Sequence, residues 1–199
     1  MTSMTVKEKI LHVALDFFSQ KGYTATTLDE IAEAAGMKAP NIYNYFKDKE
    51  DILRNIHLIA DEPYQGLIGY DQKMPIWIHN GDELKQYTKY HVNHTITNET
   101  IVKLRKLCTI EQFKYDELAE KMSAHQYDLI NALYERLFNE MIDKGSMKPG
   151  DPKVRALQYS APITLLIQLY DRAPDRSDEV EKMLEDHLDT FIEAYCVNE

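Results

Sequence analysis

Between Lys38 and Asn44 the chain places amide and ammonium side chains at spacings that suit contact with nucleic acid. Asn41 and Asn44 are three residues apart, so in a helix they share one face. An asparagine amide can pair with both hydrogen-bonding groups on the major-groove edge of adenine, and a lysine can reach a phosphate or a guanine edge. We therefore expect Asn41 and Asn44 to contact bases, with Lys38 gripping the DNA beside them.

Four further side chains around this face are suited to phosphate contact. Thr27 and Tyr43 carry hydroxyl groups, and Lys47 and Lys49 carry ammonium groups. Contacts of this kind fix how a protein lies on a duplex but carry no sequence information. We expect these four residues to contact phosphates.

Local helix signals predict the elements that hold these side chains. Thr27 and Glu30 form a capping box that begins a short helix, and Gly36 ends that helix. A second short helix is predicted over residues 39–46, and Asp48 caps a third. Two short helices around a glycine turn make a helix-turn-helix, whose second helix is placed to enter a DNA major groove. An ordinary helical hairpin with a polar outer face is the competing interpretation.

An aromatic run followed by lysines, within residues 43–49, favours the helix-turn-helix. The stretch from Thr26 to Leu53 resembles the DNA-binding signature of the tetracycline-repressor (TetR) family of bacterial regulators. Two residues depart from that signature: Met37 stands where Val is usual, and Lys38 replaces the Ser that usually caps the second helix. Pro40 is then left to hold the start of that helix. The matching positions are Thr26, Thr27, Leu28, Ile31, Ala32, Ala35, Gly36, Ile42, Tyr43, Tyr45, Phe46, Lys49, Glu50 and Leu53.

Helical periodicity without strand-like alternation predicts an all-α fold. The resemblance implies two parts: residues 1–48 form a three-helix DNA-binding domain with the helix-turn-helix, and residues 49–199 form a helical ligand-binding and dimerisation domain. A first helix, capped by Thr5 and Glu8, is expected to carry the two shorter helices.

Apolar residues recur nearly as heptads in the last two predicted helices, which follow Pro152. The stripe of the first includes Val154, Leu157, Ala161, Leu165 and Leu169, and that of the second includes Val180, Leu184, Leu188 and Phe191. The two helices could pair within one chain, whereas in the family this helix pair packs against the same pair of a second subunit. We expect a homodimer, because a symmetric operator requires two recognition helices about one DNA turn apart.

Charge is distributed unevenly along the 199 residues. The net charge is −10, of which residues 1–55 carry only −1. The acidic remainder disfavours general nucleic-acid binding and leaves docking to a small basic patch.

Cys108 and Cys196 are predicted to be free thiols in a reducing cytosol. The longest nearly apolar run, Ala161–Tyr170, is too short to span a bilayer, so we expect a cytoplasmic protein with no membrane partner.

Candidate ligand-binding residues are aromatic side chains and histidines beyond the helix-turn-helix. His91 and His94 could share a metal, but the sequence fixes no third ligand, so a polar pocket lining is the favoured interpretation and hydrogen bonding within a core stays open. We expect no metal and no cofactor. The full set of candidates is Trp77, Tyr87, His91, His94, Tyr127 and Tyr134.

The resemblance implies a ligand-responsive transcriptional regulator, most simply a repressor that a small-molecule effector releases from a palindromic operator. No nucleotide-binding glycine loop, nucleophile elbow or metalloprotease pattern is present, so we expect no enzyme. Two alternatives stay open. One is a small-molecule-binding or adaptor protein that has lost specific DNA binding, and the other is an all-α enzyme using His91 and His94.

Overall fold

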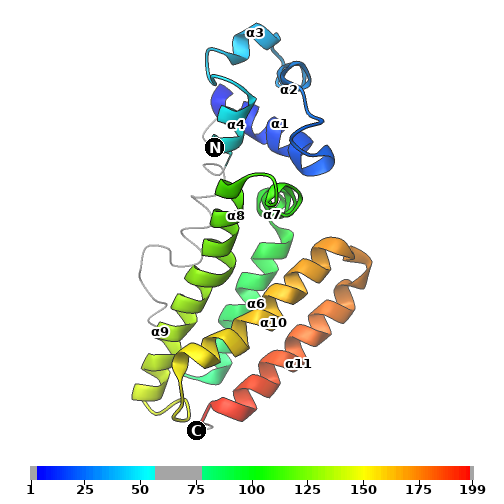
Figure 1. Ribbon diagram of the computed structural model, residues 1–199. Coiled ribbons are helices and arrows are strands. Elements are labelled where there is room, and N and C mark those ends of the chain that lie inside the picture. The colour runs from blue at the N-terminus through cyan, green and yellow to red at the C-terminus, as the bar shows by residue number, and fades with distance from the viewer. Residues whose placement is uncertain (1–3, 57–77, 198–199) are drawn as a thin grey trace. The chain divides into compact units, whose positions relative to one another are not determined.

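The computed structural model describes residues 4–56 and 78–197, except for the side chains of residues 117, 118, 121, 122, 125 and 126. All regular elements in these residues are helices, with no strand, so the predicted all-α fold is confirmed (Figure 1). The chain divides into two compact units. The first unit comprises Met1–Leu67 and Asn98–Ala119, and the second comprises Ile68–Thr97 and Glu120–Glu199.

Five helices lie wholly within the described part of the first unit. They are α1 (Val6–Lys21), α2 (Leu28–Ala34), α3 (Ala39–Ile42), α4 (Lys49–Asn55) and α7 (Glu99–Glu111). Both predicted capping boxes are present, at Thr5 for α1 and at Thr27 for α2. Asp48 caps α4 as predicted, because its side chain accepts a hydrogen bond from the Asp51 N–H. Local sequence therefore sets where these short helices begin.

A single apolar core holds the helices of the first unit together. The fully buried residues come from each of these five helices: Ile10, Ala14 and Phe18 from α1, Ile31 from α2, Ile42 from α3, Ile52 from α4 and Leu107 from α7. Burying a side chain of this size stabilises the fold by about 1.5–3 kcal/mol. Because α7 contributes to this core, the compact unit extends beyond the predicted domain of residues 1–48.

The second unit is a bundle of helices (Figure 1). Its long helices are α6 (Gly81–Thr97), α9 (Ile130–Asp143), α10 (Pro152–Arg172) and α11 (Ser177–Tyr195). A helical run over α8 (Asp116–Ser123) and a π-helical segment (Ala124–Leu129) leads into α9. The 3-10 turn Pro174–Arg176 joins α10 to α11.

The turn before α10 is held by one buried cation. The guanidinium of Arg155 donates to the carbonyls of Lys148 and Pro149 and lies 4.8 Å from the ring centroid of Tyr195. Asp151 caps α10, its carboxylate accepting from the N–H groups of Lys153 and Val154. This turn fixes the direction in which α10 leaves α9.

Cys108 and Cys196 are both free thiols, as predicted. Cys196 is buried at the end of α11, where burial raises the pKa of its thiol. Within residues 4–56 and 78–197 no helix combines the length and apolar character needed to cross a membrane.

Candidate nucleic-acid interface and ligand site

Two backbone hydrogen bonds fix the turn between α2 and α3. Gly36 adopts φ +79°, which favours glycine, and its N–H donates to the Glu33 carbonyl at 2.9 Å. The Met37 N–H donates to the Ala32 carbonyl at 2.9 Å, and the Met37 side chain packs on the core. This pair of bonds is the Schellman arrangement, so the chain leaves α2 in a defined direction.

The second helix of the helix-turn-helix is shorter than predicted. The α-helix ends at Ile42, and the chain continues through a turn in which the Tyr45 and Phe46 N–H groups both donate to the Ile42 carbonyl. Lys38 occupies the N-cap position without a side-chain capping bond, and Pro40 lies in the first turn. The missing cap is the physical consequence of Lys in place of Ser, since an ammonium group cannot accept a hydrogen bond.

The outer face of α3 and its following turn displays polar side chains. Ile42 and Phe46 are buried in the core of the first unit, which fixes the rotation of this segment. The residues that project outward are Lys38, Asn41, Tyr43, Asn44 and Lys47, all of them exposed. None of these five side chains makes a hydrogen bond or ion pair within the part of the chain that the structure describes. Five of the seven predicted DNA-binding residues are therefore brought together on one accessible surface, which we call the α3 face.

Thr27 uses its hydroxyl within its own helix. The hydroxyl donates to Glu30 Oε2 at 2.9 Å and accepts from the Glu30 N–H at 3.3 Å, while the Thr27 N–H donates to Glu30 Oε2 at 2.9 Å. The capping box thus occupies both donors of Thr27, which leaves no free donor for the phosphate contact predicted from the sequence.

The ammonium group of Lys49 is bonded within the first unit. It donates to the carbonyls of Tyr23 (2.8 Å) and Thr26 (2.7 Å), and it lies 4.3 Å from the ring centroid of Tyr23. Burial lowers the pKa of Lys49, an effect that the negative charge of Glu111 opposes. Lys49 is therefore bound to the turn between α1 and α2 and stands apart from the α3 face.

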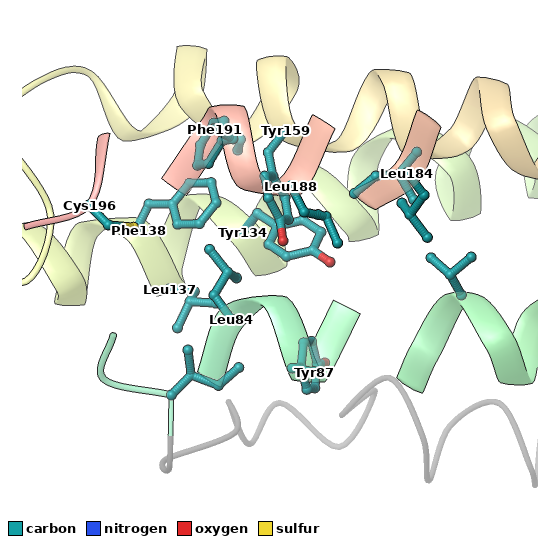
Figure 2. Close-up of a cluster of buried hydrophobic side chains, with 14 of the residues drawn as sticks. Leu84, Tyr87, Tyr134, Leu137, Phe138, Tyr159, Leu184, Leu188, Phe191 and Cys196 are labelled. Carbon is teal, nitrogen blue, oxygen red and sulfur yellow. The ribbon is translucent and has the colours of Figure 1, made fainter. Parts of the chain in front are cut away.

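In the second unit, polar groups gather inside the bundle. The Thr88 hydroxyl on α6 lies 2.7 Å from the Tyr159 hydroxyl on α10 and 3.5 Å from the Tyr134 hydroxyl on α9. Figure 2 shows the rings of Tyr134 and Tyr159 beside each other, with Tyr87 projecting from α6. The ring centroids of Tyr134 and Tyr159 are 4.8 Å apart. We call Thr88, Tyr134 and Tyr159 the hydroxyl cluster.

His91 lies on α6, one turn after Tyr87. The two ring centroids are 4.2 Å apart in an edge-on arrangement. Burial, assisted by the nearby charge of His94, lowers the pKa of His91 to about 4, so its imidazole is neutral at pH 7. The Nε2 atom of His94 is buried and has no hydrogen-bond partner among the described residues. Neutral imidazoles and hydroxyls can recognise polar atoms of an uncharged ligand.

The remaining predicted ligand residues are not part of this group. Tyr127 lies in the π-helical segment and is 55% exposed, so the structure does not place it with the hydroxyl cluster. Trp77 lies outside the described residues. Thr88 and Tyr159 were not predicted from the sequence, and their only signal was the placement of a polar-tipped side chain among apolar neighbours. Over the described residues, no three His, Cys, Asp or Glu side chains are grouped to hold a metal ion.

Residues 10–56 match the model of the bacterial regulatory proteins of the tetR family. The chain is 30% identical to the HTH-type transcriptional regulator QacR of Staphylococcus aureus, over 69% of this chain and 71% of QacR. It is 28% identical to the HTH-type transcriptional regulator AcrR of Shigella flexneri, over 96% of this chain and 89% of AcrR.

Solved structures share the fold along almost the whole chain. SmeT, the repressor of a multidrug efflux pump in Stenotrophomonas maltophilia, superposes with a TM-score of 0.71 at 21% identity, over 96% of this chain and 91% of SmeT. The complex of SmeT with triclosan gives a TM-score of 0.74 at 22% identity, over 97% of this chain and 92% of that chain. The sequence matches, which extend well beyond the helix-turn-helix, show that the chain belongs to the TetR family of bacterial regulatory proteins and is a transcriptional regulator.

Proposed function

We propose that this regulator is a repressor that binds a palindromic operator as a homodimer and that a small molecule releases. The observation that carries the proposal is the α3 face. Five exposed amide, hydroxyl and ammonium side chains project from one short segment, whose inner side is anchored by Ile42 and Phe46. A rigid element with free hydrogen-bonding groups is what base recognition in a major groove requires.

The α3 face divides into two kinds of contact. Asn41 and Asn44 read base edges, because an amide can both donate to and accept from adenine. Lys38, Tyr43 and Lys47 contact phosphates and set the register. Thr27 and Lys49 support the α3 face indirectly, by holding the start of α2 and the turn before it, since their polar atoms are bonded within the protein.

The homodimer is supported by the outer side of α10. Val154, Leu157 and Leu165 are exposed, whereas Ala156, Tyr159 and other residues of the opposite side are buried in the bundle. A stripe of exposed leucine and valine at helical spacing is costly in water and suits a matching surface. We propose that α10 and α11 form the interface with a second copy, because a palindromic operator requires two α3 faces about 34 Å apart, one turn of DNA.

The effector site is proposed around the hydroxyl cluster and His91. SmeT binds triclosan, a small molecule, and has the same fold as this chain. Tyr87, His91 and Tyr134 offer aromatic surface and neutral polar groups in the second unit. A ligand held there releases DNA only if it binds the conformation with misplaced recognition helices more tightly than the DNA-bound one.

Selection of bound fragments from a random DNA pool by the purified protein tests the proposal. The expected result is an enriched palindrome whose half-sites lie about one helical turn apart. An enriched single half-site would contradict the dimer but keep DNA recognition. If nothing is enriched, either from the pure protein or after addition of cell extract, the repressor is excluded and the adaptor alternative is favoured.

A further inference from the structure

The turn between α1 and α2, residues 22–26, is held by hydrogen bonds within itself and to residues distant in the sequence. Gly22 adopts φ +83°, and its N–H donates to the Phe18 carbonyl at 3.0 Å. The buried Thr26 hydroxyl donates back to the Gly22 carbonyl at 2.9 Å. The turn immediately precedes Thr27, the cap of α2, so its position sets where the helix-turn-helix begins.

Lys49, the first residue of α4, holds this turn from one side. Two of the three N–H groups of its ammonium are directed to the Tyr23 and Thr26 carbonyls. The same ammonium lies over the Tyr23 ring, a cation–π contact. A lysine bound in this way spans the turn from its second residue to its last.

Glu111, the last residue of α7, holds the turn from another side. It is fully buried, and its Oε1 accepts a hydrogen bond from the Tyr23 N–H at 3.0 Å. Its Oε2 lies 3.2 Å from the Lys114 ammonium in an ion pair that lacks hydrogen-bond geometry. A Cβ at Gly22 would lie only 3.0 Å from Glu111 Oε1, so the turn approaches the carboxylate closely. Burying a carboxylate is costly, and an apolar residue would fill this position more easily.

Aromatic contacts complete the arrangement. The Tyr23 ring packs against Phe18 of α1 and against Tyr115, which follows α7, each at a centroid distance of 5.3 Å. Both the backbone and the ring of Tyr23 are therefore fixed by residues distant in the sequence. The three elements that meet at Tyr23 are α1, α4 and the end of α7.

We propose that Lys49 and Glu111 form a clamp on the α1–α2 turn and are positioning residues for DNA recognition, with Lys49 bonded to the turn rather than to a phosphate. The clamp ties the start of α2 both to α4 and to α7, and thereby holds the α3 face in its DNA-binding orientation. The consequence for DNA rests on the proposed function, whereas the clamp itself can be measured without DNA.

The salt dependence of operator binding separates a clamp from a phosphate contact. Loss of one phosphate contact flattens the slope of log affinity against log salt by about 0.9. We expect Lys49→Met to weaken binding about tenfold or more at every salt concentration while the slope stays that of the wild type. Lys47→Ala is the matched control, because this exposed lysine should flatten the slope. A slope flattened in Lys49→Met as much as in Lys47→Ala would overturn the clamp.

Amide hydrogen exchange of the DNA-free protein tests the clamp at Tyr23. We expect Glu111→Ala to speed exchange of the Tyr23 amide at least about tenfold while leaving amides in the centre of α1 protected, since only the turn is released. Glu111→Gln keeps an acceptor oxygen and should restore most of the protection and most of the operator affinity. Equal exchange at Tyr23 in the wild type and in Glu111→Ala would refute the proposal.

The hydrogen-exchange experiment still tests the clamp when the binding experiment cannot be done. If Lys49→Met does not fold, exchange in the two Glu111 variants still decides whether the turn is clamped. If the wild type binds no operator, the proposed repressor function fails, but rapid Tyr23 exchange confined to Glu111→Ala would still support the clamp.

Discussion

The two compact units handle their polar side chains in opposite ways. The first unit buries apolar residues of α3 and leaves Lys38, Asn41 and Asn44 free in solvent. The second unit turns Thr88, Tyr134 and Tyr159 inward, where their hydroxyls meet. A free outer surface suits a large charged partner such as DNA, and an internal polar cluster suits a small uncharged molecule.

This contrast implies that substitutions in the two regions affect different quantities. On the α3 face a change should alter DNA binding and leave the free energy of unfolding nearly constant, because the side chains have no internal partners. In the interior of the bundle a change should alter the free energy of unfolding first, because the buried side chains there are packed against one another and the hydroxyls of the hydroxyl cluster meet.

Phe138→Ala should have the largest effect. Phe138 of α9 is fully buried and its ring stacks near Phe191 at a centroid distance of 5.5 Å, so truncation leaves a cavity (Figure 2). We expect a loss of about 3–5 kcal/mol in the free energy of unfolding, measured by urea denaturation. Tyr43→Ala on the α3 face is the control and should change stability by less than about 0.5 kcal/mol. Equal losses in the two variants would break the contrast.

Acid should destabilise the second unit through His91. Its pKa is about 4 in the folded protein and near 6.5 when unfolded, so between these values the unfolded chain binds more protons. The contribution of His91 is fully present above pH 6.5 and is lost as the pH falls toward 4, by at most about 3 kcal/mol. Urea denaturation as a function of pH should show this loss in the wild type and a weaker dependence in His91→Gln. An unchanged dependence in the variant would assign the effect to other groups.

Tyr159→Phe tests the hydroxyl cluster with a smaller change. Removing this oxygen leaves the Thr88 hydroxyl without its 2.7 Å partner, and we expect a loss of about 1–3 kcal/mol in thermal or urea unfolding. Adding Thr88→Val should recover part of the loss, because both polar groups are then replaced by apolar ones. A double variant whose loss equals or exceeds the sum of the two single losses would show that the hydroxyls do not act as a pair.

Thr27→Ala should give the smallest of the four predicted losses of stability. The variant loses the side-chain bonds of the α2 capping box, which costs about 0.5–2 kcal/mol. Because the hydroxyl is internal, operator binding should keep its wild-type salt slope. A flattened salt slope with unchanged stability would instead support the phosphate contact of Thr27 that the sequence predicts.

Features set by neighbours in sequence were predictable. The caps at Thr5, Thr27 and Asp48 and the turn glycine Gly36 follow from residues within a few positions, and the structure confirms them. The buried apolar residues Ile42 and Phe46 determine which side of α3 and its following turn is exposed. Local rules suffice where the partner is one helical turn away.

Features set by distant partners could not be predicted. The Lys49 ammonium binds the carbonyls of Thr26 and Tyr23, which come 23 and 26 positions earlier in the sequence. Glu111 accepts a hydrogen bond from Tyr23 across 88 positions, so no local pattern marks either contact. In α10, apolar residues lie on two sides, and periodicity alone did not identify the side with Tyr159 as the buried one. Packing between helices decides such cases.

If the α3 face reads DNA bases, its two asparagines should determine which DNA sequence the protein prefers. Titration of the selected operator and of a scrambled fragment is compared for the wild type and for the variant Asn41→Ala/Asn44→Ala. We expect the variant to lose most of its discrimination between the two fragments, by about 1–3 kcal/mol for each asparagine, while its melting temperature is unchanged. Undiminished discrimination in a folded variant would contradict base reading by the α3 face.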